Sequence, residues 1–547
     1  MVNEKGISTK AILLLAGALF VGLLARLPGV WWGSNFPPGW YSHHPDEYTH
    51  VLHAQRIINR KQPAFDAESS PAIGLNDPWA AGYSVTPYPK GMAAHVSAPV
   101  IAHRILTGTP LSTPPPPSAG LIPLGRLVSV LYGTATILIV FLLARRLFRE
   151  PAVALLAAWL MALGGLHVTQ SHFFVADVPA LFWLLTGTLL LWHDLEEPEN
   201  GRPAALAAAA FCFGIAFGMK LFVAAFPSLG VAALMRKQRI WRVALAIAFT
   251  QCGIYIVNLG FYTPLDFYYT VLSGISDPAI FSRLSSTLLY LVELPSIVSF
   301  PIFIAAVVGI SMLAASLLKQ ETTSRRNRVL LVVLLPLIVQ LALVVFKLDH
   351  FPRHLIPFIP WLVLVAAWSF VKLAHLLNAK YRQAPRLVYI ALVAYLVVFV
   401  YDGEKGFLAE PRNAAANWIY DNVEKGSTLW WYYHGLPGYK GSKFPGGRPD
   451  VIVEEMHHAN HYMSGMGLRD SLPRDYRYIF DMNSQAQVDA FQALFTGKSE
   501  YKETARFGEN YFMPEYTLTD WLIGNRSRNY LAEVVIFINR NTTPTMR

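Results

Sequence analysis

Residues 11–27 read AILLLAGALFVGLLARL, an apolar run with a single charge, Arg26, near its end. A helix needs about 20 such residues to cross the hydrocarbon core of a bilayer, so this segment predicts a membrane span. The run is long for the apolar part of a secretion signal, and no small-residue cleavage motif follows it. We therefore expect it to be retained as the first of several spans.

The composition of the whole chain agrees with this interpretation. The 547 residues are 54% hydrophobic and only 15% charged, which excludes a soluble domain of ordinary composition. The net charge of +10 would suggest a nucleic-acid partner in a soluble protein. Here many of the Lys and Arg residues lie in short loops between apolar segments, so we expect an orientation signal in the membrane and no nucleic acid. The two cysteines lie in apolar runs and predict no disulfide framework.

Apolar segments of similar length recur as far as residue 402, and they predict an all-α polytopic membrane protein. About eleven spans are expected, at residues 10–27, 121–148, 151–167, 177–193, 203–219, 221–235, 241–261, 294–318, 328–346, 354–376 and 386–402. With a cytoplasmic N-terminus, every second loop is rich in Lys and Arg, as the positive-inside rule requires. We therefore expect a membrane domain over residues 1–402, with a long first outer loop at 28–120.

The tail at residues 403–547 is expected to be a small extracytoplasmic α/β domain, because an odd number of spans places it outside. Its segment NAAANWIYDNVEKGSTLWWYYH at 413–434 predicts a helix, a turn and a strand. The segment LAEVVIFINR at 531–540 predicts a closing strand. Alternation of strand and helix is typical of small α/β domains.

The strongest candidate for catalysis lies in YSHHPDEYTH at residues 41–50, just after the first span. Asp46 is a candidate general base, and Glu47 a candidate helper that positions an acceptor or a metal. The alternative is structural: Pro45 followed by two acids is typical of a helix N-terminus, which we predict here for a helix at 45–59. On such a helix Asp46, His50 and His53 share one face, so they are candidate ligands for a divalent cation.

A second acid, Asp177, lies in SHFFVADVPALF at residues 171–182, in the next short outer loop. It is a candidate catalytic residue, and the alternative is a helix cap, since Pro179 follows two residues later. Both acidic motifs face the same side of the predicted membrane. Topology alone therefore predicts that they converge.

Five cations lie at the outer boundary of the predicted membrane. They are candidate ligands for a phosphate group: Lys90, Lys220, Lys347, Arg353 and His354. Arg353 is favoured because its guanidinium can bind two phosphate oxygens at once. For each of them alone, the alternative is contact with lipid headgroups.

With these motifs the chain resembles the GT-C superfamily of integral-membrane glycosyltransferases, in the branch of protein O-mannosyltransferases and the aminoarabinose transferase of lipid A. The resemblance covers roughly residues 10–430 and is carried by HPDE (44–47), SHFFVADVP (171–179), GIAFGMKLFVAAFP (214–227), FPRHLIPFIP (351–360) and NWIYDNVEKGS (417–427). It implies a polyprenyl-phosphate sugar as donor, a catalytic role for the acidic motif of the first loop, and inversion at the sugar.

The expected function is transfer of that sugar to a hydroxyl of a protein, lipid or glycan at the outer face of the membrane. The main alternative is a polytopic transporter or flippase, which should carry acids or broken helices near the bilayer midplane, often in related halves of the chain. A third possibility is an assembly protein whose working part is the tail.

Overall fold

The computed structural model of the protein describes residues 8–33, 45–58, 91–110, 118–196, 202–220, 226–234, 239–258, 284–319, 335, 338–339, 352–378, 383–408, 410–431, 436, 438–442, 444, 447–455, 489–490, 493–508, 511–523 and 533–541. For some residues at helix ends and in α2 (Pro45–Ile58), Asp46 among them, only the backbone is described.

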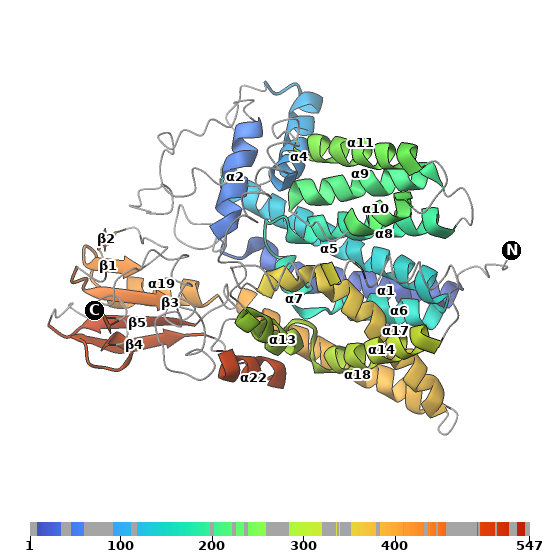
Figure 1. Ribbon diagram of the computed structural model, residues 1–547. Helices are drawn as coiled ribbons and strands as arrows, with labels where there is room; N and C mark the ends of the chain where they lie inside the picture. Colours follow the sequence, from blue (N-terminus) through green and yellow to red (C-terminus); the bar gives the residue numbers. More distant parts are fainter. Residues whose placement is uncertain are drawn as a thin grey trace.

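A bundle of apolar helices forms most of the described chain (Figure 1). Its members are α1 (Thr9–Arg26), α5 (Ser118–Phe148), α6 (Pro151–Ala162), α7 (Gly165–Gln170), α8 (Asp177–Glu196), α9 (Pro203–Met219), α10 (Phe226–Leu234), α11 (Arg239–Val257), α13 (Leu284–Val298), α14 (Phe300–Lys319), α17 (Ile359–Asn378) and α18 (Ala384–Glu404). Six described helices are long and apolar enough to span a membrane, or up to seven if α13 and α14 form one span. The protein is therefore a multi-pass membrane protein, and the expected total of eleven spans is not confirmed.

The span predicted at 294–318 covers the end of α13 and most of α14, and these two helices are not collinear. Between α13 and α14 the axis turns by 116°, at Ser299, whose φ of 85° lies in the left-handed region. Serine adopts that region only at an energetic cost, and Pro295 in the last turn of α13 lacks a backbone N–H. The hydropathy of residues 294–318 is that of one continuous apolar run, so it cannot indicate the change in backbone direction. The span predicted at 328–346 lies almost entirely outside the described residues.

Two helices of the first loop pack together beside the bundle. The helix predicted at 45–59 is observed as α2 (Pro45–Ile58), and the loop also carries α4 (Gly91–Thr107). Both contact α5. Val51, Ala54 and Ile58 are buried on one side of α2, which explains why this polar sequence lies against the bundle.

Charged residues at the ends of α5, α8, α11 and α17 meet at one end of the bundle. Ion pairs tie the helix ends together there: Arg146 with Glu196 at 3.4 Å, Arg242 with Asp194 at 2.5 Å, and Lys372 with Glu150 at 3.6 Å. The other end carries the acidic motifs and adjoins the C-terminal domain.

The described residues of the C-terminal domain form a mixed five-stranded sheet in the order β2-β1-β3-β5-β4. The strands are β1 (Thr428–Trp431), β2 (Lys440–Gly441), β3 (Val451–Glu455), β4 (Tyr501–Phe507) and β5 (Val534–Asn539). The helix α19 (Pro411–Asn422) packs Ala415, Ala416 and Ile419 against one face. The predicted helix, turn and strand at 413–434 are thus confirmed for the described residues, and the predicted closing strand lies inside the sheet, antiparallel to both neighbours.

Part of the tail returns to the bundle. The helix α22 (Pro514–Ile523) packs on α13, and Tyr516 stacks on Phe399 of α18 with ring centroids 4.7 Å apart. Glu515 is buried and accepts hydrogen bonds from Phe300 N at 2.9 Å and from the Tyr395 hydroxyl at 2.7 Å. The tail therefore caps the start of α14, next to the break at Ser299. The boundary at 402/403 remains a prediction.

Candidate functional site

Asp177 and Lys220 meet at the end of the bundle that adjoins the C-terminal domain. Asp177 begins α8, and Lys220 follows the last residue of the antiparallel α9, so each charge lies at the helix end whose dipole favours it. Lys220 Nζ lies 2.6 Å from Asp177 Oδ1. Asp177 is buried, whereas the Lys220 side chain is 21% exposed and can reach a ligand. A predicted catalytic acid and a predicted phosphate ligand are thus direct neighbours.

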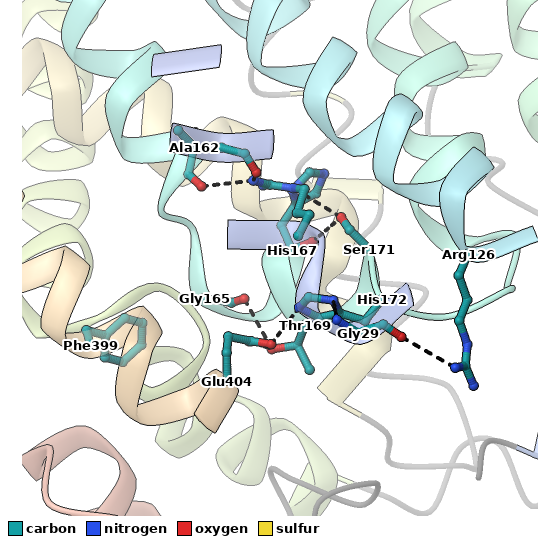
Figure 2. Close-up of polar contacts among 12 residues, drawn as sticks. Gly29, Arg126, Ala162, Gly165, His167, Thr169, Ser171, His172, Phe399 and Glu404 are labelled. Atoms are coloured by element: carbon teal, nitrogen blue, oxygen red, sulfur yellow. Dashed lines mark hydrogen bonds and ion pairs between the residues drawn. The ribbon is translucent and has the colours of Figure 1, made fainter. Parts of the chain in front are cut away.

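A tightly packed turn at residues 171–176 leads into Asp177. Gly29 N donates to His172 Nδ1 at 3.1 Å, which leaves the His172 proton on Nε2, 2.8 Å from Glu404 Oε2 (Figure 2). A Cβ at Gly29 would overlap the His172 ring, and a Cβ at Gly125 would overlap the Phe174 ring. The turn therefore fits only because α5 and the segment after α1 present glycines to it.

Arg26 supports the same turn from inside the bundle. It is fully buried, and its guanidinium lies 2.8 Å from His167 Nδ1 and 3.3 Å from Ser171 Oγ. It also donates to the carbonyl oxygens of Gly22 and Ala162. A buried cation inside an apolar helix needs such partners, so Arg26 fixes the turn rather than facing lipid.

Glu47 forms a bidentate ion pair with Arg126 of α5. Arg126 Nε donates to Glu47 Oε1 at 2.8 Å, and Nη2 donates to Oε2 at 2.7 Å. The backbone N–H of Phe174 donates to Glu47 Oε1 at 2.7 Å, and both charged side chains are almost completely buried. Glu47 therefore joins α2 to α5 and to the turn before Asp177. The two acidic motifs do converge, through this carboxylate.

Arg126 also reaches the segment after α1. It donates to the carbonyl oxygens of Gly29, Val30 and Trp32, and the contact with Gly29 is drawn in Figure 2. A guanidinium that donates hydrogen bonds to several carbonyl oxygens at once fixes the relative position of the segments that carry them. Arg126 thus fixes the start of the first loop to α2.

The proposed metal ligands are only partly described. His50 is buried with its ring centroid 5.5 Å from that of Phe174, and His53 is half-buried one turn later. The Asp46 side chain lies outside the described residues. Among the side chains that are described, no three His, Cys, Asp or Glu residues gather in a way that could hold a metal ion.

The remaining predicted phosphate ligands divide into two groups. Arg353 and His354 lie on the 3-10 helix η6 (Pro352–Phe358), which packs against α7, α8 and α13. The Tyr290 hydroxyl of α13 lies 3.0 Å from His354 Nδ1 and orients that ring. Lys90 and Lys347 lie outside the described residues.

The structure adds residues that the sequence did not single out, namely Arg126, His172 and Glu404. Arg126 had a usable signal, because a charge within an apolar span needs a buried partner. The partnership of His172 with Glu404 had none, since it joins residues far apart in the chain.

Comparison with known proteins places this geometry in context. Residues 124–272, which include Arg126, Asp177 and Lys220, match the family Dolichyl-phosphate-mannose-protein mannosyltransferase. A segment of 122 residues is 34% identical to the undecaprenyl phosphate-alpha-4-amino-4-deoxy-L-arabinose arabinosyl transferase of Pseudomonas aeruginosa (strain LESB58). That alignment spans 22% of this chain and 22% of the relative.

Two solved structures of the Archaeoglobus fulgidus oligosaccharyltransferase share the fold. One, a complex with Zn and sulfate, has a TM-score of 0.51 and 12% identity, covering 91% of this chain and 72% of the other. The second, AglB with an inhibitory peptide and a dolichol-phosphate, has a TM-score of 0.50 and 12% identity, covering 97% and 88%. The predicted resemblance to the GT-C superfamily is therefore confirmed, in sequence over residues 124–272 and in fold over the described chain.

Proposed function

We propose that this protein is an integral-membrane glycosyltransferase that moves a sugar from a polyprenyl-phosphate donor to an acceptor hydroxyl. The observation that carries the proposal is the Asp177–Lys220 pair, which puts an acid and an accessible cation at one end of the bundle, beside the helix that bears Asp46 and Glu47. A lipid-linked sugar needs this combination, because its phosphate lies at the membrane surface and its sugar in water. The matched mannosyltransferase family and the arabinosyl transferase relative support the same donor class.

The proposed reaction forms one C–O bond and breaks one at the anomeric carbon, and it moves one proton. The acceptor oxygen attacks the anomeric carbon, Asp46 takes the proton of the hydroxyl, and the bond from that carbon to the phosphate oxygen breaks. Polyprenyl phosphate leaves, and the sugar inverts its configuration. Lys220, Arg353 and His354 stabilise the departing phosphate, together with Lys90 and Lys347.

Glu47 has a different proposed role from Asp46. Its oxygens are taken up by Arg126 and Phe174 N–H, so it holds the first turn of α2 in place, and the neighbouring Asp46 is left for chemistry. Asp177 keeps Lys220 directed at the phosphate and is the second candidate for the base. Among the described side chains around Glu47, His50 and His53 there is no cluster of three metal ligands, and the Asp46 side chain is not one of those described.

We place this end of the bundle, the first loop and the C-terminal domain outside the cytoplasm. The opposite end carries the Arg and Lys residues of alternate loops, which supports a cytoplasmic location for that end. The acceptor is a protein, lipid or glycan hydroxyl.

A strain lacking the gene tests the proposal. Mass spectrometry of its lipids should show a polyprenyl-phosphate sugar accumulating, and the cell envelope should lack the corresponding glycan modification. Expression of the wild-type protein should reverse both changes, and expression of the Asp46→Asn variant should reverse neither. Unchanged lipids and glycans in the deletion strain would reject the proposed function.

A further inference from the structure

Trp32 lies between two buried ion pairs, Arg126 with Glu47 and Arg412 with Glu455. It follows η1 (Pro28–Trp31), and its buried ring contacts those of Phe173 and Phe407, with centroids 5.6 Å and 5.1 Å away. Phe173 belongs to the turn before Asp177, and Phe407 follows the last span. This indole of the first loop thus contacts the second acidic motif and the start of the C-terminal domain.

Two buried guanidinium groups approach this indole. The guanidinium carbon of Arg126 lies 5.4 Å from the Trp32 centroid, and that of Arg412 lies 5.3 Å from it. The indole N–H donates to Glu410. We call Trp32, Arg126, Arg412 and Glu410 the Trp32 junction. Such contacts are strongest where water is excluded, as it is here.

Each arginine of the junction is paired with an acid from a different part of the protein. Arg126 pairs with Glu47 of α2, and Arg412 Nε donates to Glu455 Oε2 of β3 at 3.0 Å. A shift of β3 or α19 therefore moves Arg412 against Trp32. Because Trp32 also contacts Arg126, the shift is passed on to Glu47 and the first turn of α2.

We propose that Trp32 and Arg412 are positioning residues, through which the C-terminal domain sets the placement of α2 and of the turn before Asp177. The proposal rests on the proposed function, since it assigns the tail a part in the same site. Neither residue is among the cations proposed to hold the phosphate. Loss of the junction should therefore lower kcat for sugar transfer and leave the KM for the donor nearly unchanged.

The test compares Arg412→Lys with Arg506→Met in the full-length protein. Arg412→Lys keeps a positive charge beside Glu455 and loses the planar group over Trp32, so the sheet should stay folded. Arg506 lies in the same domain, where its pairs with Glu503 and Glu533 are exposed, and it serves as the control. Amide hydrogen exchange of α2 and of β3 is measured, together with kcat and KM.

We expect exchange in α2 to accelerate about tenfold in Arg412→Lys, with β3 still protected and kcat lowered, while Arg506→Met matches wild type. Wild-type exchange in α2 with β3 protected would overturn the proposal. If β3 loses protection as well, Trp32→Phe is measured in its place, because it keeps a ring and removes the donor to Glu410; unchanged α2 exchange there is again the contradicting result. The exchange measurement needs no substrate, so an inactive wild-type protein would reject the proposed function without affecting this inference.

Discussion

Breaking the ion pair between Glu47 and Arg126 should release α2 from the bundle. The contacts predict that Arg126→Met destabilises the packing of α2 more than Glu47→Gln does. In Arg126→Met the Glu47 carboxylate stays buried and loses both hydrogen bonds from the guanidinium, while Phe174 N–H still donates to it. Removing one partner of a buried ion pair destabilises by about 3–5 kcal/mol, because the other charge is left uncompensated. In Glu47→Gln, Arg126 keeps the carbonyl oxygens of Gly29, Val30 and Trp32, so the expected loss is about 1–3 kcal/mol.

Hydrogen exchange of the buried amides at Val51, Ala54 and Ile57 reports this release. At about 1.4 kcal/mol per factor of ten, Arg126→Met should lower their protection by about two to four orders of magnitude. The double variant should cost less than the sum of the two single ones, since both remove the same interaction. Gln55→Ala, on the same helix and outside the ion pair, is the control. Wild-type protection in Arg126→Met would refute the assignment of Glu47 as the anchor of α2.

Three further predictions concern other contacts in the structure. Lys220→Met should weaken binding of polyprenyl phosphate about 10- to 150-fold, and Lys220→Arg should recover part of that affinity. Asp177→Asn should lower the rate of sugar transfer without this loss of affinity. Wild-type affinity in Lys220→Met would contradict the phosphate role of Lys220. Gly29→Ala should lower the melting temperature through overlap with His172, whereas Gly230→Ala, where a Cβ meets nothing within 4 Å, should not; similar melting curves would count against the packing described. Burial and the neighbouring Glu455 raise the pKa of Glu454 well above its usual 4.5. The folded state therefore holds a proton that the unfolded state loses, and stability should fall as the pH rises above 4.5. Thermal unfolding of Glu454→Gln should show a smaller fall, and an identical pH dependence would assign the effect elsewhere.

Local signals in the sequence predicted much of the helical architecture. Pro45 predicted the start of α2, and the apolar runs predicted the bounds of α8, α9 and α18 within a few residues. The pattern of Lys and Arg in alternate loops predicted that Arg146, Arg242 and Lys372 lie at the same end of the bundle, as they do. These features are local, or they depend only on counting loops.

The sequence could not predict features that depend on side chains meeting in space. Glu47 and Arg126 are 79 positions apart, and only packing of α2 against α5 makes the acid an anchor rather than a free helper. The bend at Ser299 is a property of one dihedral angle inside an apolar run. The return of α22 to the bundle depends on buried contacts of Glu515 and Tyr516 that no pattern in the tail indicates.

Sugar transfer by the purified protein in liposomes is the most direct test of the central claim. The deletion strain supplies both substrates, its accumulated polyprenyl-phosphate sugar as the donor and its unmodified cell-envelope fraction as the acceptor, and released polyprenyl phosphate is measured over time. We predict release by the wild type, and a rate at least about 100-fold lower in Asp46→Asn, because general-base catalysis contributes about 10²- to 10⁴-fold. Binding of polyprenyl phosphate should persist in that variant, since Asn serves as a helix cap about as well as Asp. Near-normal release by Asp46→Asn would move the base to Asp177, and no release by the wild-type protein would contradict the account.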